Sequence, residues 1–135
     1  MTSITKQQSL DAGKALRPRD IADVVGKYIK EGNMEGIMSM FHEDCVVHFP
    51  PAPLTVGPKL IGELFTPFVA SGATLTSSVT NELIVGDSAL LQADWKLESK
   101  EGVEMSKGSS TEVAKQKPDG SWVYYIDCPF GPPTI

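Results

Sequence analysis

The sequence has 135 residues, of which 41% are hydrophobic and 21% charged, a composition typical of one soluble globular domain with its own core. The formal net charge of −5 argues against nucleic acid as a partner, because a phosphate backbone is bound by a basic surface. No apolar run is long enough to span a membrane, and residues 1–19 lack the apolar centre of a secretory signal. We therefore expect a cytoplasmic protein.

The cysteines and histidines indicate no metal site. Cys45 and Cys128 lie far apart in the sequence, and a cytoplasmic chain favours free thiols over a disulfide. His42 and His48 are too few and too loosely spaced to hold a metal ion. We expect structural or neutral roles for all four residues and predict no cofactor.

Residues 1–17 are polar and weakly patterned. They are interpreted as a mobile N-terminal arm, with a short leading helix as the alternative. We expect a single domain over residues 18–135, because no repeat or linker divides it.

Two helices and a strand are predicted between residues 20 and 51. Apolar residues spaced three and four apart predict a helix from Asp20 to Gly32 and a second, capped by Asn33, that includes Phe41. Residues 45–49 read as a strand that ends at Pro50 and Pro51, since proline donates no ladder hydrogen bond.

A third helix is predicted to begin at Pro58, where the missing N–H of proline is tolerated. Leu64, Phe65 and Phe68 contribute to its apolar face, and Pro67 should kink or end it.

From residue 74 onward the apolar period changes from helical to strand-like. Strands are predicted at residues 74–85, 88–99, 103–116 and 122–128, with Gly108 as a bulge and a hairpin at residues 118–120. Residues 88–99 alternate strictly, which places Trp95 on the buried face. Helices followed by long antiparallel strands indicate an α+β fold with helices on one face of a curved sheet.

Several short segments resemble the nuclear transport factor 2-like superfamily. They are Lys27-Tyr28-Ile29, Glu31-Gly32-Asn33-Met34-Glu35, Met40-Phe41, Asp44-Cys45-Val46-Val47, Gly57 with the helix after it, and Gly120 to Asp127. The resemblance covers residues 22–130 and is closest to the SnoaL-like and ketosteroid isomerase-like members. It implies a cystatin-like cone: a curved mixed sheet wrapped around the N-terminal helices, with an apolar cavity at one end. It also implies a homodimer through the outer face of the sheet, where Gln92, Asp94, Lys96 and His48 would lie.

Steroid isomerases of this superfamily use a tyrosine, a carboxylate base and a protonated acid. By resemblance the tyrosine falls on Tyr28, the base on Phe49 and the acid on or near Ser109. Phenylalanine cannot accept a proton, so this sequence argues against steroid isomerase activity by that mechanism.

Strand alternation suggests a different acid–base group. If the last strand points Tyr125 and Asp127 inward, the Asp127 carboxyl lies in an apolar pocket, where burial would raise its pKa. Tyr28 would donate a hydrogen bond to a substrate oxygen, and the predicted pocket is completed by Tyr125, Trp95, Phe49, Ser109, Val47 and Phe65. The alternatives are that Asp127 accepts backbone hydrogen bonds in a turn and that Tyr28 is a core residue. His48 could face either side of its strand.

Two functions therefore compete. One is a non-catalytic pocket for a small, largely apolar molecule. The other is a cofactor-independent isomerase, cyclase, dehydratase or hydrolase with Asp127 as acid/base and Tyr28 as hydrogen-bond donor. A third, a protein-interaction scaffold, would require an exposed apolar groove.

Overall fold

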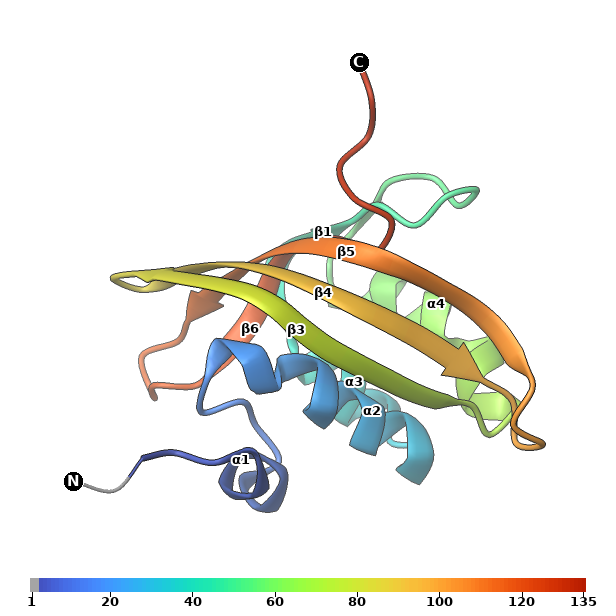
Figure 1. The fold of residues 1–135 in the computed structure, drawn as a ribbon, viewed down its shortest axis with the longest axis horizontal. Helices are drawn as coiled ribbons and strands as arrows, with labels where there is room; N and C mark the ends of the chain where they lie inside the picture. The colour runs from blue at the N-terminus through green and yellow to red at the C-terminus, as the bar shows by residue number, and fades with distance from the viewer. Residues whose placement is uncertain (1–2) are drawn as a thin grey trace.

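The computed structural model describes residues 3–135. Four α-helices and a 3₁₀ turn occupy α1 (Lys6–Ala12), η1 (Pro18–Asp20), α2 (Ile21–Glu31), α3 (Met34–Ser39) and α4 (Pro58–Ala70). The strands are β1 (Phe41–Val47), β2 (Thr55–Val56), β3 (Thr74–Val85), β4 (Ser88–Glu98), β5 (Glu104–Gln116) and β6 (Trp122–Cys128) (Figure 1). The predicted α+β class is confirmed.

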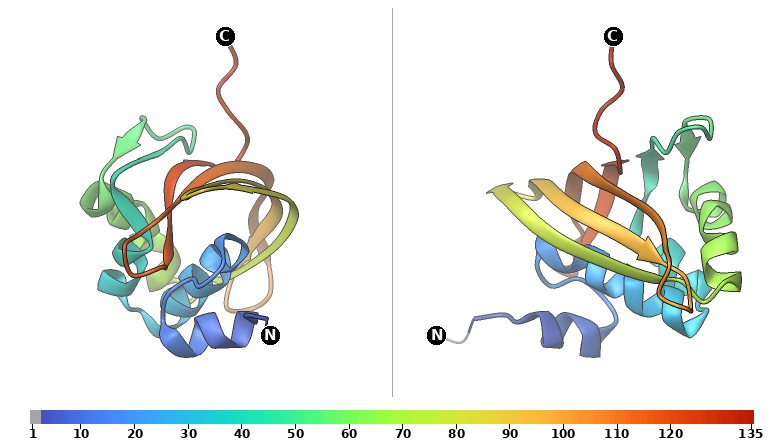
Figure 2. Two further views of the ribbon diagram at one scale, coloured as in Figure 1. Left: turned by 90° about the vertical axis from the view of Figure 1, so that its left-hand side faces the viewer. Right: turned by 45° about the vertical axis from the view of Figure 1, so that its right-hand side comes forward.

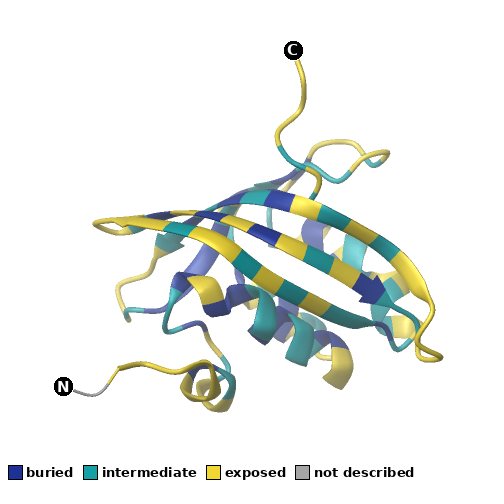
Figure 3. Cartoon of the chain, in the orientation of Figure 1, coloured by how far each residue is buried: buried dark blue, intermediate teal, exposed yellow. Residues whose placement is uncertain are grey.

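The strands form one mixed sheet in the order β2-β1-β6-β5-β4-β3. Strands β3, β4, β5 and β6 follow one another as an antiparallel meander, whereas β1 lies parallel to β6. Figure 2 shows that the sheet arches over α2, with α4 beside the concave side near β1. Buried and exposed residues alternate along the long strands, so one face of the sheet covers the interior (Figure 3).

The helices begin and end where local chemistry predicts. Helix α2 follows the 3₁₀ turn and ends at Gly32, whose φ of 67° is the left-handed conformation that glycine adopts readily. The Asn33 side chain accepts a hydrogen bond from the Gly36 N–H at 2.9 Å and caps α3. Pro67 lies inside α4 and does not end it.

Residues 3–17 contain the short helix that was the alternative to a mobile arm; residues 1–2 lie outside the described part. Helix α1 starts with a capping box in which Thr5 and Gln8 bond reciprocally. It is fixed to α2 by a buried polar cluster: the Asp20 carboxylate accepts from the Ser9 hydroxyl at 2.7 Å and from two nitrogens of Arg17 at 2.8 Å each.

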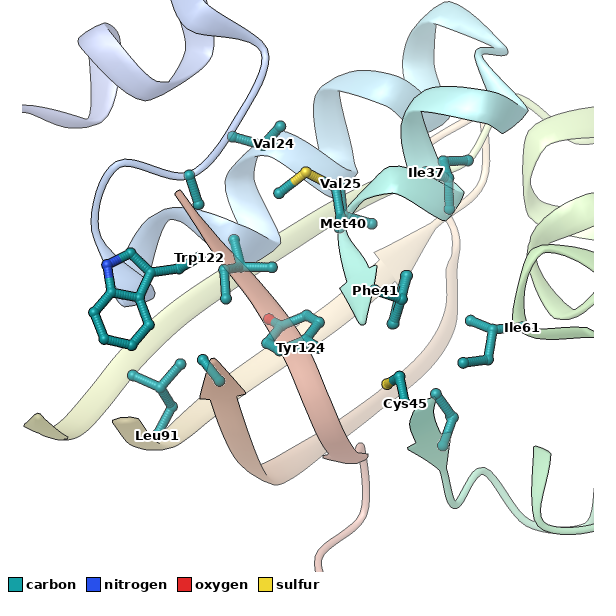
Figure 4. Packing of buried hydrophobic residues seen from close by; sticks show 14 of the residues in the cluster. Val24, Val25, Ile37, Met40, Phe41, Cys45, Ile61, Leu91, Trp122 and Tyr124 are labelled. Atoms are coloured by element: carbon teal, nitrogen blue, oxygen red, sulfur yellow. The ribbon is translucent and has the colours of Figure 1, made fainter. Parts of the chain in front are cut away.

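The buried core includes the apolar face of α2 and Trp122 of β6. Ile21, Val24 and Leu91 are almost fully buried in this core, and Figure 4 labels Val24 and Leu91. Phe41, Cys45 and Ile61 extend the buried cluster toward α4. None of the helices within residues 3–135 is long and apolar enough to cross a membrane.

Three details of the predicted elements are wrong. Phe41 opens β1 instead of closing α3, and β1 ends at Val47, so Phe49 follows the strand. Gly108 is not a bulge, because it pairs regularly with Trp95. A Cβ there would lie only 2.8 Å from the Phe130 ring, so glycine allows the C-terminal segment to approach β5 closely.

Candidate functional site

A cavity lies between the concave face of the sheet, α2 and α4. The space in which the centre of a water-sized sphere can move measures about 90 Å³. Its lining is mostly apolar and comes from both layers of the fold. The residues are Ala22, Val25, Phe41, Val47, Phe49, Leu64, Phe65, Phe68, Leu75, Ser77, Trp95, Leu97, Ser110, Glu112, Tyr124, Asp127 and Pro129.

Aromatic rings form a continuous series around this cavity. The Phe41 ring contacts Tyr124 and Phe65, with centroid distances of 5.7 and 5.8 Å. Phe65 contacts Phe68 at 6.4 Å, and Phe68 contacts Phe49 at 6.5 Å. These separations and tilted geometries are those of favourable aromatic pairs. The series gives the cavity a rigid apolar wall.

The C-terminal segment closes one side of the cavity. The Phe130 ring stacks on Phe49 at 5.4 Å with an interplanar angle of 12° and lies 5.5 Å from Trp95. The Trp95 indole N–H donates to the Pro129 carbonyl at 2.7 Å. This bond holds the indole in place and occupies its only donor.

Two acidic residues, Glu112 of β5 and Asp127 of β6, lie at the polar end of the cavity. They are directly opposite in the antiparallel register, so both side chains point to the same face. They are 6% and 9% exposed, respectively. Of the residues that the structure describes, no Lys, Arg or His lines this cavity. The two carboxyls therefore face each other without a cationic partner among the lining residues.

Burial and proximity make this pair hard to ionise. Desolvation raises the pKa of Glu112 to about 7 from an ordinary 4.5. The pKa of Asp127 is raised well above its usual range, first by desolvation and then by the charge of Glu112. Two carboxylates that share a dry site retain at least one proton near neutral pH. The pair can therefore both donate and accept a proton.

Tyr124 and Ser110 supply the other polar atoms beside Glu112. A hydrogen bond from each hydroxyl lowers the pKa of Glu112, though less than burial raises it. The Ser110 hydroxyl also has the Ala93 carbonyl within 3.3 Å, and its single proton can serve only one acceptor at a time. Burial keeps Tyr124 a neutral phenol by raising its pKa well above the usual value.

The structure brings five of the eight predicted site residues together. Asp127, Trp95, Phe49, Val47 and Phe65 all line the cavity. The backbone of Asp127 is held in place as well: its carbonyl accepts a hydrogen bond from the His48 N–H at 2.9 Å, which joins the end of β1 to β6.

Tyr28 lies elsewhere, contrary to the predicted site. Its hydroxyl donates to the Gly13 carbonyl, and its ring packs on Gly36, where a Cβ would come within 2.5 Å of the Tyr28 ring. Tyr28 thus fills the junction of α1, α2 and α3, which is the core role given above as its alternative.

Tyr125 and Ser109 also point away from the cavity. Tyr125 is an extra residue at a β-bulge, and its ring contacts His42 at 5.1 Å and lies 5.5 Å from the Lys115 ammonium. The Ser109 hydroxyl donates to the exposed Asp94 carboxylate at 2.7 Å on the outer face. Their neighbours Tyr124 and Ser110 occupy the predicted places.

Glu112, Tyr124, Ser110 and Ser77 are the polar cavity residues that sequence reasoning missed. One feature of the sequence points to this site: a glutamate, Glu112, lies in the middle of a predicted strand between Thr111 and Val113. Alternation within β5 offered no help, because polar residues occupy both of its faces.

The cysteines and histidines add no further chemistry to the cavity. Both cysteines are free and buried, and burial raises the pKa of the Cys45 thiol, which therefore stays neutral. Within the described chain, no group of three or more His, Cys, Asp or Glu side chains is arranged to hold a metal ion.

Comparison with known protein families assigns the chain to one of them. The model of the SnoaL-like domain matches residues 25–125. The chain belongs to the SnoaL-like domain family. Among curated proteins, none matches the sequence significantly.

Solved structures agree on the fold. A nuclear transport factor 2-like protein with a cystatin-like fold from Novosphingobium aromaticivorans has a TM-score of 0.71 at 14% identity, over 82% of this chain and 76% of that one. A ketosteroid isomerase-like protein from Erwinia carotovora atroseptica has a TM-score of 0.60 at 16% identity, covering 84% and 92%. A provisionally assigned scytalone dehydratase from N. aromaticivorans has a TM-score of 0.67 at 13% identity, covering 91% and 81%. The nuclear transport factor 2-like, cystatin-like fold is therefore confirmed, and identities this low show the fold alone.

Proposed function

We propose that this SnoaL-like protein binds a small, largely apolar molecule in the cavity between its sheet and α4. The observation that carries the proposal is the combination of an aromatic wall with a few convergent polar groups at one end. Ligand sites commonly have this composition, because apolar surface supplies affinity and a few polar atoms fix orientation.

A pair of adjacent serines on β3 offers a direct test. Ser77 lines the cavity, whereas Ser78 is exposed on the other face of the same strand. We expect toluene to perturb the NMR signals of the Trp95 indole and of the cavity phenylalanines in the unmodified protein. Ser77→Leu should fill the cavity and abolish these shifts, and Ser78→Leu should leave them unchanged. Equal shifts in both variants would locate binding elsewhere and refute the proposal.

The carboxyl pair favours a second candidate, a cofactor-independent isomerase, cyclase, dehydratase or hydrolase. Asp127 would act as the acid/base, as the sequence suggested, but with Glu112 and Tyr124 beside it in place of Tyr28. A carboxyl with a raised pKa can exchange protons with a substrate near neutral pH.

Hydrogen exchange at carbon would distinguish an enzyme from a binding protein. We expect an enzyme to accelerate the exchange of the α-hydrogens of cyclohexanone with deuterated water, and Asp127→Asn to remove that acceleration. Asp94→Asn, which changes a carboxylate on the outer face, is the matched control. Exchange at the uncatalysed rate would leave the binding function alone.

We further propose that the protein is a homodimer formed through the outer face of the sheet. An apolar row crosses four strands in register there, from Leu83 to Leu90, Val113 and Ile126. Three of these side chains are substantially exposed: Leu83 by 61%, Leu90 by 46% and Ile126 by 40%. Leu90→Lys should shift the sedimentation coefficient from dimer to monomer; a monomer before the substitution would contradict the proposal.

A further inference from the structure

The polar end of the cavity has an imbalance of charge that bears on the ligand. Glu112 and Asp127 are opposite each other and buried, and the polar atoms nearest to them are neutral hydroxyls. A buried carboxylate normally has a cationic partner, because leaving its charge uncompensated in a dry site is unfavourable. Elsewhere in this chain that pattern holds: the buried Asp20 carboxylate is bound by the Arg17 guanidinium.

The lining residues supply no such cation, and the neighbouring titratable groups supply no positive charge either. The thiols of Cys45 on β1 and Cys128 on β6 are neutral, as is the Tyr124 phenol, because burial raises the pKa of each. Asp23 on α2 adds a further negative charge that raises the pKa of Tyr124. Since no described lining residue is cationic, a bound proton compensates the pair in the free protein.

The aromatic residues beside the pair are suited to the same missing charge. Tyr124 and Phe41 are in contact with each other, and both line the cavity with Glu112 and Asp127. Aromatic faces attract cations, and the attraction increases when the cation is desolvated. Carboxylates and rings at one end of a cavity are the two kinds of group that recognise an ammonium ion.

We propose that the ligand of this cavity is a small organic amine bound as its ammonium ion, with the Glu112–Asp127 pair as counter-ion and the aromatic rings around its hydrocarbon part. The inference rests on the proposed binding function and specifies the ligand class. The ammonium replaces the proton held by the pair: its N–H groups donate to the carboxylates, and the displaced proton leaves to solvent. Charge is thereby conserved within the cavity.

Three one-ring molecules of nearly equal shape provide the test: benzylamine, benzyl alcohol and toluene. A primary amine resembling the Lys side chain, whose ordinary pKa is about 10.4, is cationic at pH 7. By calorimetry at pH 7 we expect benzylamine to bind about tenfold or more tightly than the other two, since charge-assisted hydrogen bonds exceed neutral ones. Its apparent binding enthalpy should also vary with the ionisation enthalpy of the buffer, which reports the released proton.

Matched variants separate the cavity from the acidic surface. Glu112→Gln and Asp127→Asn should each remove most of the preference for benzylamine, whereas Asp94→Asn should retain it, although all three replace a carboxyl group by its amide. Loss of the preference in Asp94→Asn to the same extent would indicate non-specific attraction and overturn the inference.

The outcomes also distinguish the amine assignment from the proposed binding of a small apolar molecule. Toluene or benzyl alcohol binding as tightly as benzylamine would overturn the amine assignment and leave the apolar binding function supported. Failure of all three molecules to bind would overturn both. Should Glu112→Gln unfold the protein, Asp127→Asn and the buffer dependence of the unmodified protein still decide between these outcomes.

Discussion

The chain contains two buried acidic sites that differ in how their charge is compensated. Asp20, which is 1% exposed, accepts from Ser9 and from two nitrogens of Arg17. Glu112 and Asp127 are also buried, but they face each other across β5 and β6. The first site is complete within the chain, whereas the second requires a proton or a ligand.

This difference indicates separate roles for the two sites. A bidentate guanidinium–carboxylate pair fixes geometry, and here it joins α1 to the start of α2. Like charges opposite each other in a sheet are unfavourable, so the second pair lowers stability when it ionises. A protein that retains such a pair beside a cavity keeps a group able to exchange protons or to bind a cation.

The largest effect that we predict is a dependence of stability on pH. The raised pKa of Glu112 means that the folded chain binds its proton more tightly than the unfolded chain. Its stabilising effect is complete below the ordinary pKa of 4.5 and is lost as the pH rises through about 7. That interval corresponds to a fall of about 3 kcal/mol in the free energy of unfolding, to which Asp127 adds in the same direction.

Urea unfolding between pH 4 and 8 measures this fall. Glu112→Gln should remove the part of this fall that comes from Glu112 and raise the stability at pH 8, while the part from Asp127 remains. Glu104→Gln, an exposed change on the same strand, should reproduce the unmodified profile. A profile in Glu112→Gln as steep as in the unmodified protein would show that Glu112 is not the source.

Removing one partner of the Arg17–Asp20 pair should lower the free energy of unfolding, whereas Glu112→Gln should raise it at pH 8. Arg17→Ala leaves the buried Asp20 carboxylate without its cation and should destabilise the protein by about 2 kcal/mol, less than for a fully buried pair because the Arg17 side chain is 29% exposed. Arg19→Ala breaks an ion pair whose arginine is 52% exposed and should change stability by less than about 1 kcal/mol. Equal unfolding free energies for the two variants would refute the structural role of Arg17.

Much of the fold followed from local patterns. Strands β3 and β6 lie at the predicted residues, because Thr- and Val-rich period-two segments bounded by turns leave little freedom. Trp95 lines the cavity as strict alternation along β4 predicts. Asp127 lines it too, although a bulge at Tyr125 interrupts the alternation of β6.

The residue opposite Asp127 could not be predicted from the sequence, because the strand register there depends on a single bulge. Gln116 pairs with Trp122 beside the hairpin, and counting regularly from there places Thr111 opposite Asp127. The extra residue Tyr125 shifts the register by one, so that Glu112 takes this position. The same bulge turns Tyr125 outward and leaves Tyr124 on the inner face.

Tyr28 was misplaced for a different reason. Helical periodicity places it beside the buried face of α2, but does not show what covers it. Its neighbours Gly13 and Gly36 come from α1 and α3, and only long-range packing brings them to its ring and hydroxyl. Residues that several helices contact are poorly predicted from the period of one helix.

The smallest effect that we predict compares Ser110 with Ser109, two adjacent serines on opposite faces of β5. Ser110→Ala removes a hydroxyl that lowers the pKa of Glu112, so that pKa should rise further. Ser109→Ala removes a bond to the exposed Asp94 and should leave the pKa of Glu112 unchanged. Each change should alter the free energy of unfolding by about 1 kcal/mol or less, so carboxyl NMR titration is the measurement that separates them. Identical titration of Glu112 in both variants would mean that the Ser110 proton serves the Ala93 carbonyl throughout, and that Tyr124 alone donates to Glu112.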